Sequence, residues 1–182
     1  MKKRLDKRAT LKYNGGIMNS KTPTQREITA AYHEAGHAVI YLYKNIHFDF
    51  VTIDPKTASE IGDEEGEECR GLVKPKKYPL IDKLTREQLK DYLIAIYAGL
   101  EAGLQIDDFV ISDGDVVFET FIIEHFVRST GEDPYNSVSQ AQDEVRGEVQ
   151  QHWSEITKVA LALLREKTLT EERVKEIIGG VR

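Results

Sequence analysis

The sequence predicts a mainly α-helical fold of the α+β class, with a small β-hairpin or sheet packed beside one of the helices. Three observations predict it. Apolar residues recur at helical spacing over several long stretches. Capping boxes stand in front of two of these stretches. Two short segments rich in β-forming residues are bounded by prolines. A chain of 182 residues suits one domain, or one domain with an extension.

The first helix is expected over residues 23–44. Thr22 is placed to act as its N-cap, Pro23 suits the first helical position, and Gln25 can close a capping box. Ile28, Tyr32, Ala35, Val39 and Tyr43 recur at helical spacing, so one face of this helix is expected in the core.

Two strands are expected next, at residues 48–55 and 69–75. The segment between them, residues 56–68, is acidic but lacks the alternating ligand order of an EF-hand. A solvated loop is the favoured interpretation, with a calcium site as a minor alternative.

The rest of the chain predicts further helices. Thr85 and Gln88 form a second capping box, which opens a helix that runs to about residue 106. After a loop over 106–115, a third helix begins near Gly114. Residues 136–167 predict one long helix kinked at Gly147, and a last short helix ends at Gly179.

Charge is unevenly distributed. Residues 1–22 carry seven Lys or Arg and one Asp, whereas the whole chain has a net charge of −6. The favoured interpretation is a basic, flexible N-terminal tail on an acidic domain at 23–182. A weaker alternative is an adaptor whose tail docks on nucleic acid or membrane. No basic patch with interleaved aromatics lies in the body, so nucleic-acid binding is not expected.

The cellular compartment is inferred from features that the sequence lacks. Cys69 is the sole cysteine, which excludes an internal disulfide and a cysteine-based zinc knuckle. No apolar run approaches the roughly 18 residues of a membrane helix, and the basic N-terminus is not followed by the apolar stretch of a signal peptide. A cytoplasmic protein without a transmembrane segment is expected.

The segment His-Glu-Ala-Gly-His, at residues 33–37, contains the residue types of a metal or catalytic site. On a helix, His33 and His37 project from one face, close enough to share a zinc ion. Glu34 is then placed to take a proton from a metal-activated water. The pattern is expected by chance only about 0.01 times in a chain of this composition. A zinc site is therefore predicted, against the alternative of two packed histidines beside an ordinary glutamate.

A third protein ligand is required, and spacing alone does not choose it. The remaining histidines have no convincing spacing to the pair. Candidate carboxylates lie later in the chain. In full, the candidates are His47, His125 and His152, and Glu101, Asp107, Asp108, Asp113, Asp115 and Glu119.

At this point the sequence resembles a known family. AYHEAGHAV, at 31–39, is similar to the zinc-site helix of the FtsH-type metallopeptidases, the protease domain of ATP-dependent membrane proteases. FVTIDP resembles the strand after that helix, and residues 152–178 resemble the C-terminal helices of the family. SDGDVV, at 112–117, resembles the segment that supplies the aspartate ligand. The resemblance spans roughly residues 25–180 and implies that Asp115 is the third ligand, with Glu119 as fallback.

The departures from the family are specific. No phosphate-binding GxxxxGK[ST] motif and no membrane helix are present, so the resemblance implies a stand-alone FtsH-like zinc peptidase domain over 23–182. In the segment 98–105, Gly99 and Ala102 match the family, but Leu100 stands in place of its arginine, and Gly103 and Leu104 in place of its acidic pair. Glu101 is then a candidate to support a ligand histidine.

The expected function is that of a zinc metalloendopeptidase. Zn²⁺ would be held by His33, His37 and Asp115, with Glu34 as general base. Substrates would be unfolded or flexible polypeptides, held by strand addition at an edge of the hairpin or delivered by a separate ATPase partner. Assembly into homo-oligomers is compatible with this function and is not decided by the sequence. The alternative is a catalytically inactive peptide-binding or regulatory module that retains the metallopeptidase fold.

Overall fold

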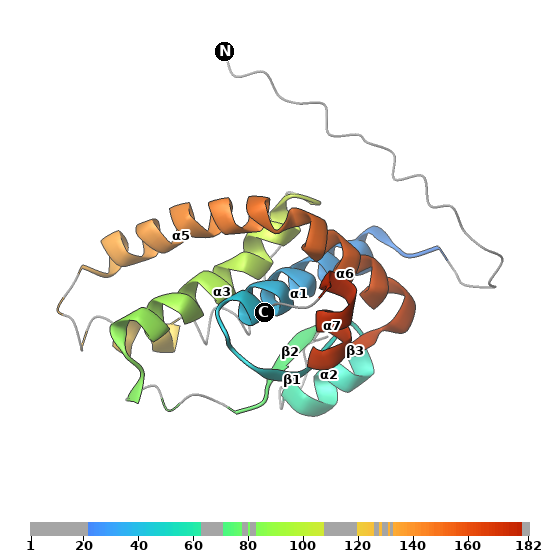
Figure 1. The fold of residues 1–182 in the computed structure, drawn as a ribbon, viewed down its shortest axis with the longest axis horizontal. Helices are drawn as coiled ribbons and strands as arrows, with labels where there is room; N and C mark the ends of the chain where they lie inside the picture. Colours follow the sequence, from blue (N-terminus) through green and yellow to red (C-terminus); the bar gives the residue numbers. More distant parts are fainter. Residues whose placement is uncertain are drawn as a thin grey trace, which may run out of the picture.

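The structure is a computed structural model that describes residues 22–62, 71–77, 80, 83–107, 120–125, 128, 131 and 133–179. The basic segment 1–21 and residues 63–68 of the acidic segment 56–68 therefore lie outside the described residues. Residues 56–62 of that acidic segment are helical, where the sequence predicts a solvated loop. Within them the chain is mainly helical with one small antiparallel sheet, as the sequence predicts (Figure 1).

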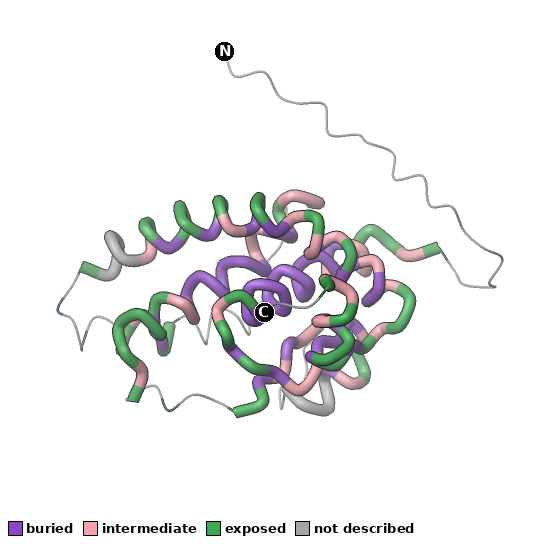
Figure 2. The backbone as a smooth tube through the Cα atoms, viewed as in Figure 1, coloured by how far each residue is buried: buried purple, intermediate pink, exposed green. Residues whose placement is uncertain are grey.

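Helix α1 (Gln25–Tyr43) runs through the middle of the molecule (Figure 1). It begins two residues later than expected. Thr24, not Thr22, is the N-cap, because its hydroxyl accepts from the backbone N–H of Glu27 and the Glu27 carboxylate accepts from the backbone N–H of Thr24. The prediction of one buried face was too narrow, because every residue from Ala31 to Leu42 is buried (Figure 2). A helix buried all round is a core helix.

Two helices flank α1, and a third packs on one of them. Helix α1 packs against α3 (Arg86–Leu104) and α6 (Trp153–Glu166), and α5 (Pro134–Gln151) packs against α3. Residues 120–125 are helical, within the third helix that the sequence predicts, and the start of that helix lies outside the described residues. None of the helices in the described ranges is long and apolar enough to cross a bilayer.

The predicted single helix over 136–167 is two helices, and the break falls at His152, not at Gly147. A Cβ added to Gly147 would meet no atom within 4 Å, and the helix continues through it. At the break, the His152 ring stacks on Tyr43 with centroids 3.7 Å apart, and Trp153 stacks on Tyr32 at 5.4 Å. These contacts with α1 are long-range, which explains why the local sequence pattern does not reveal the break.

The sheet has three strands in the order β2-β1-β3, all antiparallel. β1 (Phe48–Thr52) pairs with β2 (Leu72–Pro75) as the hairpin prediction requires. The predicted strand 48–55 was too long, because Pro55 is the first residue of a short helix, α2 (Pro55–Gly62). β3 (Thr168–Thr170) was not predicted. It pairs with the other side of β1, so β1 is the central strand.

Glu171 ties the sheet to the last helix, α7 (Glu171–Ile178), which ends at left-handed Gly179 as expected. Glu171 is only 1% exposed. It accepts hydrogen bonds from the backbone N–H of Phe48 at 2.9 Å, from His47 Nδ1 at 3.0 Å and from Lys175. Burial alone would raise the pKa of Glu171, but these donors outweigh it and lower the pKa to about 2.

The capping box of α3 is present as predicted, with Thr85 Oγ1 accepting from the backbone N–H of Gln88. Thr85→Ala is expected to lower the free energy of unfolding by about 1 kcal/mol, because one helical N–H loses its partner. Urea denaturation measures the change. Thr85→Ser should retain most of the stability, and an equal loss in both variants would contradict the capping role.

Candidate metal centre

The His-Glu-Ala-Gly-His motif lies in the middle of α1, inside the core. His33, Glu34 and His37 are only 5%, 6% and 5% exposed. Charged and polar side chains are rarely so buried, because desolvation costs free energy unless partners compensate for it. Three such groups lie within five residues of one core helix, and buried ionisable side chains in such a cluster mark a candidate functional site.

The two imidazoles face one another. Their Nε2 atoms lie 3.1 Å apart, and the rings meet edge to face at an interplanar angle of 83°. Two nitrogens that share a tetrahedral zinc at about 2.0–2.1 Å lie about 3.3 Å apart. The pair therefore fits two positions of a zinc site with a shift of a few tenths of an ångström. The structure thus places both rings on one face of α1, as their four-residue spacing predicts.

The tautomer of His37 is fixed by the neighbouring helix. His37 Nδ1 lies 2.8 Å from the carbonyl oxygen of Ala95 in α3. A carbonyl only accepts, so Nδ1 carries the proton, and in the neutral ring Nε2 keeps the lone pair that faces His33. This is the support that a ligand histidine normally receives from a backbone carbonyl or carboxylate. Glu101, the candidate that the sequence suggested, instead bonds to Gln105 at 2.9 Å.

Two glycines let α1 and α3 approach at this point. A Cβ added to Gly99 would lie 2.1 Å from Nε2 of His37, so the imidazole occupies the space that a side chain at position 99 would take. A Cβ added to Gly36 would lie 2.5 Å from the carbonyl oxygen of Ala98. Both distances are far below any real contact. Because positions 36 and 99 carry no side chains, α1 and α3 can pack closely and the His37 imidazole fits against Gly99.

A third glycine stands against Glu34. Gly71 directly precedes β2, and a Cβ at this position would lie 2.5 Å from Cγ and Oε1 of Glu34. The backbone of the chain entering β2 therefore forms a wall of the carboxylate site. The sheet is thus adjacent to the motif helix, as the sequence predicts.

The third ligand is not fixed by the described residues. Asp115 and its fallback Glu119 lie outside them, as do Asp108 and Asp113. Within the part of the chain that the structure describes, no group of three or more His, Cys, Asp or Glu side chains is positioned to hold a metal. Two other candidates are placed elsewhere, His47 beside Glu171 and His152 stacked on Tyr43.

Sequence reasoning missed the supporting positions Ala95, Gly71 and the role of Gly99. Ala95 acts through its backbone, so its identity carries no signal. Gly99 does carry a weak one, because glycine inside a helix is unfavourable by about 1 kcal/mol relative to alanine and often has a packing reason.

No protein-family model matches this chain, and no curated protein matches it.

Proposed function

We propose that this protein is a zinc metallopeptidase of the kind that the motif segment resembles, acting on unfolded or flexible polypeptides. The observation that carries the proposal is the pair of facing imidazole nitrogens, 3.1 Å apart on a core helix, with Glu34 between them in sequence. His33 and His37 would hold the metal together with Asp115. When bound, zinc supplies Lewis-acid activation of a water and of the scissile carbonyl.

The residues of the chain would act as follows. Glu34 takes a proton from the attacking water and donates it to the leaving amine. The Ala95 carbonyl holds His37 in the tautomer that presents Nε2. β1 pairs on both sides, so β2 and β3 are the edges among the described strands. β2, which starts beside Gly71 and Glu34, is the edge proposed to hold an extended substrate.

The test combines metal content with cleavage of unfolded casein. Wild type should bind about one zinc per chain. Glu34→Gln should retain the zinc and lose cleavage by about 10²–10⁴-fold, since it removes the proton acceptor but neither histidine. Asp115→Ala should lose zinc, and Glu119→Ala should retain it.

The outcomes separate the alternatives. Zinc without cleavage in wild type would favour the inactive binding module, or a peptidase that requires a separate ATPase to deliver substrates. Cleavage that persists in Glu34→Gln would contradict the assigned base. No zinc after reconstitution would overturn the proposal.

A further inference from the structure

A cavity of about 400 Å³ lies at the opposite end of α1 from its N-cap, away from the motif. Its walls come from the turn after α1, from the residues after β2 and from the first turns of α3. The side chains that matter below are Lys44, Lys76, Lys77, Gln88, Asp91 and Tyr92.

The walls are rich in cations and donors, although the chain as a whole has a net charge of −6. Lys44 is held by Glu148 at 2.5 Å and Asp91 at 3.5 Å, and Asp91 also lines the cavity. Lys44 therefore already has two carboxylate partners. The cations left for a ligand are on the segment after β2.

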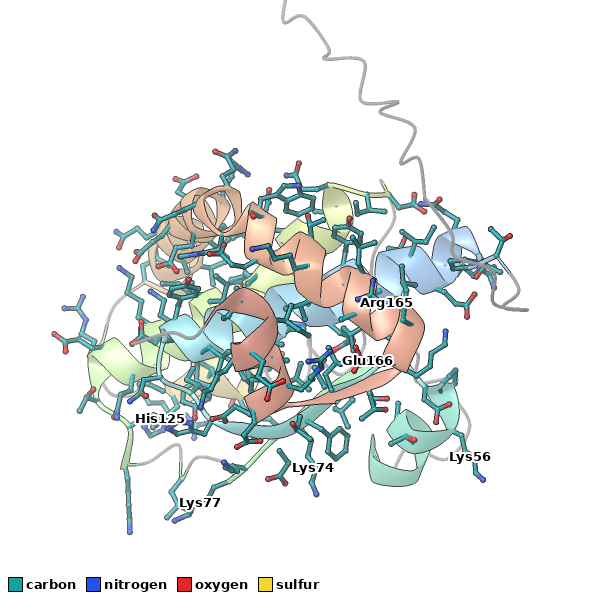
Figure 3. The ribbon with its side chains drawn as sticks, turned by 45° about the vertical axis from the view of Figure 1, so that its right-hand side comes forward. Lys56, Lys74, Lys77, His125, Arg165 and Glu166 are labelled. Carbon is teal, nitrogen blue, oxygen red and sulfur yellow. The ribbon has the colours of Figure 1, made fainter. Side chains whose placement is uncertain are left out.

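Lys76 and Lys77 follow directly on β2. The Lys76 ammonium is 3.8 Å from Glu172, and both side chains are at least half exposed, so this ion pair is weak. Lys77 is exposed (Figure 3). Lys74, by contrast, pairs with Asp49 at 3.5 Å and lies over the Phe50 ring, and it does not line the cavity.

Two neutral donors stand on the α3 side. Oε1 of Gln88 accepts a hydrogen bond from the backbone N–H of Thr85, so the side-chain N–H groups of Gln88 remain as donors. The Tyr92 hydroxyl lies on the same wall, and burial raises its pKa. Cations with neutral donors on the facing wall suit a carboxylate.

The cavity lies at a defined distance from Glu34 along two separate elements. From Glu34 to Lys44 is ten residues of helix, or about 15 Å. From Gly71, which contacts Glu34, to Lys76 is five residues of extended chain, or about 16 Å. An extended peptide spans this distance in about five residues.

We infer that this cavity binds an acidic side chain of the polypeptide substrate, about five residues from the bond that is cleaved. The inference rests on the proposed peptidase function for its spacing, but binding of the carboxylate does not require hydrolysis.

The binding test uses zinc-free full-length protein and fluorescent ten-residue peptides that differ by one Glu-to-Gln exchange, measured by anisotropy. The Glu peptide should bind about five- to tenfold more tightly, and added salt should reduce the difference. Lys76→Gln combined with Lys77→Gln should remove the preference, whereas Lys74→Gln, from the same hairpin, should keep it. No preference, or equal loss in Lys74→Gln, would overturn the cavity assignment. Inorganic phosphate that competes as well as the peptide would overturn its assignment to polypeptide.

The spacing test uses zinc-loaded wild type and peptides with a single Glu at two to eight residues from the mapped cleavage point, on either side. Cleavage should be fastest with Glu at about five residues on one side. A flat profile with intact cleavage would overturn the spacing while the peptidase function stands. Absence of cleavage with the binding preference intact would count against a peptidase that acts alone and would remove the basis of the spacing, but not of the carboxylate site.

Discussion

Replacing Gly99 with alanine is expected to abolish or severely weaken zinc binding. The added Cβ would lie 2.1 Å from Nε2 of His37, 2.4 Å from Cε1 and 2.5 Å from Cδ2, so the imidazole has to leave its place. It would lose both the hydrogen bond to Ala95 and the alignment with His33. Disturbing the support of a ligand histidine costs about 10–100-fold in metal affinity, and displacing the ligand should cost at least that. Competition with a chromogenic chelator measures the affinity.

Gly147→Ala is the matched control. It is also a glycine-to-alanine change inside a helix, but its Cβ meets nothing within 4 Å. It should leave zinc affinity unchanged and stabilise the protein by up to about 1 kcal/mol through helix propensity. The stability of metal-free Gly99→Ala, measured by urea, separates misfolding from loss of the site. A folded Gly99→Ala that binds zinc as wild type does would show that His37 is not a ligand.

Glu171→Gln is expected to destabilise the protein in a way that depends on pH. The folded pKa of Glu171 is about 2, below its ordinary value of 4.5. A carboxylate with a lowered pKa contributes stability that is fully present above the unfolded pKa and is lost as the pH falls through the folded one. A shift of this size corresponds to about 3 kcal/mol at pH 7. The loss on substitution should therefore shrink between about pH 4.5 and 2.

Thermal or urea unfolding of wild type and Glu171→Gln, repeated from pH 7 to pH 2.5, measures this difference. Glu172→Gln, one residue along the same helix and 69% exposed at its side chain, is the control and should change stability by less than about 0.5 kcal/mol. Curves for wild type and Glu171→Gln that stay parallel over the whole range would refute the assigned ion-pair network.

Features that depend on local spacing were predictable from the sequence. The four-residue separation of His33 and His37 places them on one face of any helix, and the structure brings their Nε2 atoms together. The Thr85 capping box and the end at Gly179 follow from the same kind of local chemistry. Even there, two threonines flanking Pro23 offered two caps, and Thr24 is used because its partner at N3 is Glu27.

Features that depend on distant contacts were not predictable. β3 has only three residues, too few for a period-2 pattern, and becomes a strand through pairing with β1. Pro55 was ambiguous because proline can bound a strand or open a helix. The helix break at His152 and the support from Ala95 arise from packing on α1, which no local pattern encodes.

The central position of β1 has a consequence for how the protein is made. The two strands that pair with β1 lie far from each other in the sequence. β2 follows β1 after one short helix, whereas β3 comes only after α6. During synthesis, one edge of β1 therefore stays open until residues 168–170 exist, and an open edge can pair with other chains. The backbone N–H of Phe48 likewise gains its carboxylate acceptor only after Glu171 has been synthesised. The early half of the nascent chain thus carries the entire motif but not the segment that completes the sheet beside it.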